Sequence, residues 1–418
     1  MHFSRIPSMT LAIVAAISMI GCGQKEEPKP QAAAPAAAPV AAPAPAPKPE
    51  VTVKLGHVAP LTGPQAHLGK DNENGARMAV DELNAQNLEI GGAKVKFELL
   101  AEDDQADPKQ GTIVAQKLVD AKVNGVIGHL NSGTTIPASK LYSDAGIPQI
   151  SGSATNPKYT QQGFKTAFRV MANDVQQGKI LGEYAAKQLG AKSVAIIDDR
   201  SAYGQGLADE FKKAVEAAGI KIVANERYGP KDTTALAQAL KMVAAKPDAM
   251  MVAGVGADAA MPHAQIFDAG YKGPIFQTHG AASGSFLQIG GKKVEGALML
   301  GPLVVVPDEI PDSAPSKAVT LEMIKGYEKA FGAKPPIFAA GTYDAGLLLV
   351  RAIPIAAKKG KPGTQEFRTA LRDALEDTKD LKASQGPITM SPKDHSGYDL
   401  RGQVMITVKD GKFTLAKD

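Results

Sequence analysis

The stretch VAIIDDRSAYGQGLADEFKKAVEAAGIKIVA, residues 194–224, decides the fold class. It begins with a short apolar strand over 194–197 and passes through a polar loop into a helix over 207–218. A second strand follows over 220–224. A strand, a helix and a strand in this order are typical of a parallel sheet whose faces are covered by helices.

The same alternation extends to both sides of this stretch. More strand–helix units are present than one sheet usually holds, so we predict an α/β fold of two Rossmann-like lobes with parallel sheets. Solutes in such sheets lie off the carboxyl ends of the strands. The other predicted strands are 51–58, 95–99, 123–127, 148–150, 249–253 and 274–277, the other helices are 74–84, 113–119, 136–144, 175–189, 235–245 and 259–269, and a turn-rich loop covers 60–69.

The N-terminus has the pattern of an export signal. The apolar run Leu11–Ile20 is too short to cross a hydrocarbon core of about 30 Å comfortably. It leads into Gly21-Cys22, which resembles the bacterial lipobox, where cleavage leaves a lipid-bearing cysteine first. We predict a signal peptide over 1–21, lipidation of Cys22 and an Ala/Pro-rich tether over 22–50. The alternatives are a plain signal peptide followed by a buried cysteine, and a spacer without a role.

Composition and motifs exclude several classes of function. A net charge of +4 predicts no nucleic-acid footprint, and the single cysteine excludes an internal disulfide. There is no Gly-x-Ser-x-Gly, Walker or His-x-x-x-His pattern, so we predict no enzyme, no cofactor and no metal. Two alternatives stay open. Residues 254–259 loosely fit a dinucleotide loop, and His57, His129 and His279 each fall near a strand end, where they could converge on a metal.

Three loops at predicted strand ends carry polar side chains. The loop 128–135 opens a helix, and backbone N–H groups with the Ser132 hydroxyl suit a carboxylate there. Ordinary N-capping by Thr134 or Thr135 is the alternative. The loop 151–157 adds further hydroxyls, and the third loop carries Tyr203, which either faces a solute or packs on its own loop.

From about Val51 onward the chain resembles the leucine/isoleucine/valine-binding proteins of ABC importers, which have the type I periplasmic-binding fold. Each matching stretch is short, and their order and spacing carry the resemblance. They are Pro60–Pro64, Gly69, Asn74-Gly75, Asp103–Gln110, Val126–Leu130, Pro137–Ser139, Ser153–Thr155, Tyr203–Gly206 and Tyr343–Ala345.

The resemblance implies two lobes joined by a three-strand hinge, with a solute in the cleft between them. Residues 51–171 plus 299–385 would form the first lobe, and 172–298 plus 386–418 the second. The resemblance assigns the solute carboxylate to Ser132 and Thr155. In the Ser153-Ala154-Thr155 loop, the carbonyl at Ser153 would receive an ammonium together with Thr155, and Tyr203 would contact the solute from the second lobe.

Departures from the family pattern leave the solute open. His279 stands where an acid that binds an ammonium is expected, and Val255 and Leu68 stand where aromatic residues are expected. We therefore expect a periplasmic receptor, lipid-anchored to a bacterial membrane, that delivers a branched-chain or similar amino acid to ABC permease subunits. The alternatives are a keto or aromatic acid as the solute, the same fold used as a sensor module, and an exported enzyme.

Overall fold

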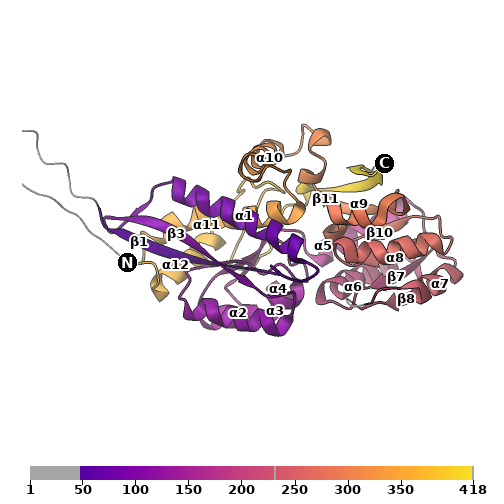
Figure 1. The fold of residues 1–418 in the computed structure, drawn as a ribbon, viewed down its shortest axis with the longest axis horizontal. Helices are drawn as coiled ribbons and strands as arrows, with labels where there is room; N and C mark the ends of the chain where they lie inside the picture. Colours follow the sequence, from indigo (N-terminus) through magenta and orange to yellow (C-terminus); the bar gives the residue numbers. More distant parts are fainter. Residues whose placement is uncertain (1–47, 230–231, 417–418) are drawn as a thin grey trace, which may run out of the picture. The chain divides into compact units, whose positions relative to one another are not determined.

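The computed structural model describes residues 48–229 and 232–416, which contain two β-sheets, each covered by helices on both faces (Figure 1). The predicted signal peptide, Cys22 and most of the predicted tether lie outside the described residues.

The first sheet has the strand order β2-β3-β1-β4-β5-β6. Its strands run parallel except for β2, which pairs antiparallel with β3 at one edge. The central strands are buried on both faces, which explains their nearly continuous apolar sequence. The bounds are β1 (Glu50–Ala59), β2 (Glu89–Ile90), β3 (Ala93–Asp103), β4 (Val126–Gly128), β5 (Gln149–Ser151) and β6 (Ala167–Arg169).

Helices far apart in sequence cover the first sheet. On one face α1 packs beside α11 and α12, and together they bury Val80, Leu349 and Phe367 against β1 and β3. On the other face α2 and α3 bury Leu118 and Tyr142. The bounds are α1 (Ala66–Ala85), α2 (Pro108–Asp120), α3 (Ser132–Asp144), α4 (Lys158–Gln161), α10 (Lys317–Phe331), α11 (Ile337–Ala356) and α12 (Gln365–Glu376).

The second sheet has the order β13-β12-β11-β10-β9-β7-β8. The strands from β7 to β11 are parallel, and β12 and β13 add an antiparallel edge. The bounds are β7 (Ser193–Asp198), β8 (Lys221–Arg227), β9 (Ala249–Ala253), β10 (Ile275–Gln277), β11 (Leu298–Pro302), β12 (Gln403–Lys409) and β13 (Lys412–Leu415).

Helices also cover both faces of the second sheet. Leu181 and Phe211, from α5 and α6, pack on one face, and Met242 and Ile266, from α7 and α8, pack on the other. The bounds are α5 (Asp174–Lys187), α6 (Ala202–Ala217), α7 (Leu236–Ala244), α8 (Gly256–Asp268) and α9 (Gly284–Gly290).

The chain passes between the two sheets three times, after β6, after β11 and before β12. The fold class predicted from the sequence is therefore confirmed. The exact lobe boundaries stay a prediction. Strand β11 lies in the second sheet, although most of it falls in the range 299–385 expected for the first lobe. Ile388 and Met390, expected in the second lobe, pack in the core beside the first sheet.

Two local predictions were wrong. Helix α1 begins at Ala66, so the expected loop over 60–69 is helical in its last part. The sheets are also not purely parallel, because antiparallel strands close an edge of each. The buried helix α11 was not predicted. It is long and apolar enough to cross a membrane, but most of it is enclosed by protein, as in the core helix of a globular domain.

One backbone contact fixes the loop after β5 against α11. A Cβ atom on Gly152 would lie 2.1 Å from the Gly341 carbonyl oxygen, and one on Gly341 would lie 2.1 Å from the Gly152 carbonyl oxygen. Neither position has room for a side chain. Helix α11 therefore supports the loop 151–157 directly.

Candidate functional site

A small cavity of about 20 Å³ is lined by residues from both lobes. Four side chains that the sequence singled out meet there: Ser132 and Ser153 from the first lobe, and Tyr203 and His279 from the second. The loops that carry them follow β4, β5, β7 and β10. The carboxyl ends of parallel strands thus bring together residues that lie far apart in the sequence. The remaining lining residues are Leu130, Asn131, Val255, Gly280 and Phe338.

Ser132 occupies the first turn of α3. The N-cap residue Asn131 makes no capping hydrogen bond with its side chain, which donates instead to Gln65 Oε1 at 2.8 Å. The Thr134 and Thr135 hydroxyls donate backward to the Asn131 carbonyl, so neither caps the helix, contrary to the alternative drawn from the sequence. The positive end of the helix dipole therefore lies at the cavity beside the Ser132 hydroxyl.

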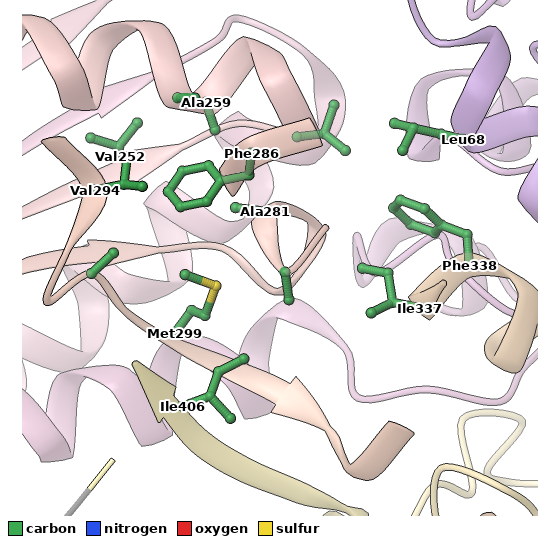
Figure 2. Packing of buried hydrophobic residues seen from close by; sticks show 14 of the residues in the cluster. Leu68, Val252, Ala259, Ala281, Phe286, Val294, Met299, Ile337, Phe338 and Ile406 are labelled. Carbon is green, nitrogen blue, oxygen red and sulfur yellow. The ribbon is translucent and has the colours of Figure 1, made fainter. Parts of the chain in front are cut away.

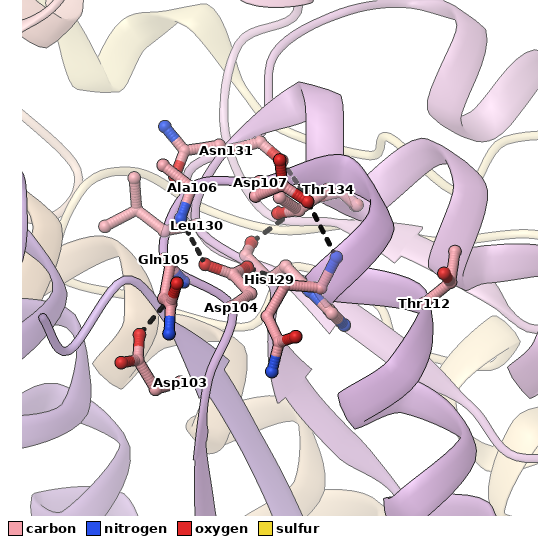
Figure 3. Close-up of polar contacts among 12 residues, drawn as sticks. Asp103, Asp104, Gln105, Ala106, Asp107, Thr112, His129, Leu130, Asn131 and Thr134 are labelled. Atoms are coloured by element: carbon pink, nitrogen blue, oxygen red, sulfur yellow. Dashed lines mark hydrogen bonds and ion pairs between the residues drawn. The ribbon is translucent and has the colours of Figure 1, made fainter. Parts of the chain in front are cut away.

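The Asp103–Gln110 stretch supports this loop rather than lining the cavity. Figure 3 shows Asp104 facing His129, whose Nδ1 lies 3.1 Å from the Asp104 carboxylate. The other ring nitrogen of His129 lies 3.1 Å from the Tyr142 hydroxyl. Asp107 caps α2 by accepting from the Gln110 amide at 2.8 Å. The two buried contacts of His129 hold the start of the loop 128–135 in place.

The loop 151–157 is braced by its own hydroxyls. Ser151 Oγ donates to the His129 carbonyl at 2.9 Å and accepts from the Ala154 amide at 2.9 Å. Ser153 Oγ donates to the Leu130 carbonyl at 2.9 Å. Neither Ala154 nor Thr155 is among the residues that line the cavity. The Thr155 hydroxyl is buried beside the Asp174 carboxyl, with which it forms no hydrogen bond of normal geometry.

Arg169, at the end of β6, is fully buried and holds the same loop. Its guanidinium donates to the Thr155 carbonyl at 3.0 Å and to the Asn156 carbonyl at 2.6 Å. Burial lowers the pKa of Arg169 to about 10, which leaves it charged at neutral pH. Burial also raises the pKa of Asp174 to about 7, against the opposing effects of the Thr155 hydroxyl and the Arg169 charge.

Tyr203 lies in the first turn of α6 and reaches the loop after β10. Its hydroxyl accepts from the Gly280 amide at 2.9 Å, and burial raises its pKa. A side chain at Gly280 would collide with the Tyr203 ring. The alternative that Tyr203 packs only on its own loop is therefore wrong, because the ring contacts a second loop and lines the cavity.

His279 begins a 3-10 helix, His279–Ala281, and is 3% exposed. Its Nε2 atom is buried and has no hydrogen-bond partner. Burial lowers its pKa to about 4, and no charged side chain contributes to this shift. The ring is therefore neutral at physiological pH. Burial therefore disfavours a cationic His279 in the protein without solute.

Three apolar side chains complete the walls of the cavity. Leu130 and Phe338 line it from the first lobe and Val255 from the second. Figure 2 shows Phe338 beside Leu68, in the apolar cluster that also contains Ala281 and Phe286. The sequence reasoning had marked Leu68 and Val255 but missed Phe338, which comes from the start of α11. Pro335-Pro336 ahead of an apolar run was the signal that could have located this helix start.

The histidines at the strand ends do not converge. His57 Nδ1 bonds the Ile127 carbonyl at 2.9 Å, and His129 is engaged by Asp104 and Tyr142. Within residues 48–229 and 232–416, no group of three or more His, Cys, Asp or Glu side chains is arranged to hold a metal.

A larger groove of about 730 Å³ lies between α3 and α4 of the first lobe and α6 of the second. Its charges are largely paired on α6, as in Lys212 with Asp209 and Lys213 with Glu210. The smaller cavity is the stronger candidate site, because unpartnered buried polar atoms and apolar walls meet there.

Comparison with known proteins decides the family. The model of the periplasmic binding protein family matches residues 52–407. A Leu/Ile/Val-binding protein homologue from Brucella suis is 37% identical over 325 residues, which are 77% of this chain and 82% of that protein. The chain belongs to the periplasmic binding protein family.

Solved structures of relatives have the same two-lobe fold. An extracellular ligand-binding receptor from Rhodopseudomonas palustris matches with a TM-score of 0.80 at 35% identity, over 88% of this chain and all of that one. The branched-chain amino acid transporter substrate binding protein LivJ from Streptococcus pneumoniae, solved with isoleucine, matches with a TM-score of 0.74 at 28% identity, over 87% and 98% of the two chains.

In this periplasmic binding protein, Arg169→Met should destabilise the fold. The substitution keeps much of the apolar volume but removes the donors to the Thr155 and Asn156 carbonyls and the positive charge near Asp174. The lost hydrogen bonds should lower the free energy of unfolding by about 1–3 kcal/mol, measured by urea denaturation. Arg401→Met, at an exposed arginine, is the matched control and should leave the unfolding midpoint nearly unchanged. Equal stability of the Arg169 variant and wild type would show that Arg169 does not hold the loop.

Proposed function

We propose that the protein is an extracytoplasmic solute-binding lipoprotein of an ABC importer, which binds a small carboxylate between its two lobes and delivers it to the permease. The observation that carries the proposal is the shared cavity. Ser132 and Ser153 face it from the first lobe, and Tyr203 and His279 face it from the second. A solute placed there would touch both lobes and favour their approach.

The class of solute is proposed from the chemistry of the cavity and from the relatives. The start of α3 and the Ser132 hydroxyl suit a carboxylate, and the apolar walls suit a branched or aromatic skeleton. The names of the relatives favour a branched-chain amino acid. The uncharged His279 favours the second candidate, a keto or aromatic acid.

Entry of the solute requires movement. The cavity volume of about 20 Å³ suffices for about one water molecule, and hydrogen bonds also join the two lobes directly. Asn156 Nδ2 donates to the Ala202 carbonyl at 2.6 Å, and His67 Nε2 lies 3.2 Å from Ser285 Oγ. These contacts join the lobes through α6 and α9. We propose that they break when the three crossovers bend and the lobes separate.

Ser132→Ala and Thr155→Ala should each weaken solute binding by about tenfold or more, because each removes one hydroxyl from the proposed carboxylate site. Calorimetry should use the tightest-binding member of a panel of amino acids and their 2-oxo acids. Thr112→Ala, at a half-buried threonine of α2 outside the cavity lining, is the control and should bind as wild type does. Wild-type affinity in both site variants would place the carboxylate elsewhere. Failure of wild type to bind any panel member would contradict the proposed function.

The lipid anchor is tested separately. Cys22→Ala should release the protein from the membrane fraction or leave its signal peptide uncleaved, because two or more acyl chains at this residue would supply the whole attachment. Immunoblots of washed membrane and soluble fractions measure the distribution. Persistent membrane attachment of a correctly cleaved variant would rule out Cys22 as the sole anchor.

A further inference from the structure

The cavity has a favourable position for one negative charge. Helix α3 points its N-terminus at it, its N-cap residue Asn131 makes no capping hydrogen bond, and the Ser132 hydroxyl lies in the first turn. An independent observation also indicates a ligand. His279 Nε2, in a residue that is 97% buried, has no hydrogen-bond partner and belongs to the cavity lining. A polar atom left unpartnered at a site of this kind is a candidate contact for a bound molecule.

The cavity has no matching position for a positive charge. None of its lining residues is an aspartate or a glutamate. His279 is uncharged, since only burial acts on its pKa. A buried ammonium without a counter-charge is costly, because the neutral dipoles around it replace only part of its hydration.

Three acids on neighbouring segments, Asp174, Asp199 and Asp258, lie outside the cavity lining. Asp174 lies under Gly206, where a Cβ atom would approach its carboxylate to 2.6 Å. Both of its carboxylate oxygens are buried without a hydrogen-bond partner, and burial raises its pKa to about 7, so it carries only part of a negative charge at neutral pH. Asp199 accepts from the Ser201 amide at 2.9 Å, and burial raises its pKa to about 6. Partial burial raises the pKa of Asp258, against the opposing effects of a hydrogen bond from Gln65 and the charge of His67. None of these three acids lines the cavity.

We propose that this site selects a carboxylate whose second polar group is uncharged, a 2-oxo or 2-hydroxy acid, over the α-amino acid with the same carbon skeleton. His279 is the residue that determines this selectivity. With a proton on Nε2, its ring donates to a carbonyl or hydroxyl oxygen of the solute. Without that proton, it accepts from a hydroxyl. The inference rests on the proposed function, because it concerns the solute of the same cavity.

Matched pairs of solutes test the proposal directly. L-leucine and 4-methyl-2-oxopentanoate differ only at the α-carbon, as do L-phenylalanine and phenylpyruvate. Calorimetry on the wild-type mature protein should show that the oxo acid of at least one pair binds about tenfold or more tightly than its amino acid. Tighter binding of the amino acid in every pair that binds would overturn the selectivity and leave the proposed function standing. If no carboxylate of the panel binds, the proposed function fails and the selectivity falls with it.

Substitutions at His279 assign the selectivity to this residue. His279→Glu supplies a negative charge and should invert the preference toward the amino acid. His279→Gln keeps the site uncharged and should retain the preference for the oxo acid, even where the affinity falls. Thermal melts establish that each variant is folded. If the glutamate variant does not fold, the glutamine variant decides the point, because a switch to the amino acid in this neutral variant would contradict the role of His279.

Discussion

The rest of the binding region depends on the buried guanidinium of Arg169, which stands where the chain leaves the first sheet for the second. It donates to the Thr155 and Asn156 carbonyls, and the Asp174 amide, at the start of α5, donates to the same Thr155 carbonyl at 3.0 Å. One carbonyl group therefore ties the last strand of the first sheet to the first helix of the second lobe. The amide of Asn156 in turn donates to Ser132 Oγ at 3.3 Å. The same hydrogen bonds therefore fix both the loop 151–157 and the crossover that follows β6.

A charge in this place carries a desolvation cost, which is tolerated only where hydrogen bonds and an opposite charge offset it. The Asp174 carboxyl favours the charge on Arg169, and Gly206 lets α6 approach both Asp174 and Asn156 without a side chain between them. The Asn156 amide group then donates to the Ala202 carbonyl, next to Tyr203. A continuous series of contacts therefore runs from Arg169 at the crossover through Asn156 to the Ala202 carbonyl beside the solute site.

The sequence predicted the fold class because its apolar residues recur with strand and helix periods in alternating segments. It singled out Ser132, Ser153, Tyr203 and His279 because parallel strands place their carboxyl ends at one edge of the sheet. It did not predict Phe338. Helix α11 is apolar nearly all round, so its pattern does not show which residue faces a site. It also did not predict the Arg169 cluster, because a buried arginine in a short strand resembles a surface residue until the carbonyls that surround it are known. Solute contacts at Ala154 and Thr155 require the cavity to widen, because its present lining does not include them.

The proposed function requires that a solute is held between two lobes that move to admit and enclose it. Small-angle X-ray scattering of the mature protein, with and without a solute that calorimetry shows to be saturating, tests this claim most directly. The variant carrying both Ser132→Ala and Thr155→Ala, at the same solute concentration, controls for effects of the solute on the solvent. The account predicts a smaller radius of gyration for the wild-type protein with solute and no change for the variant. Superimposable wild-type profiles at saturation would contradict it.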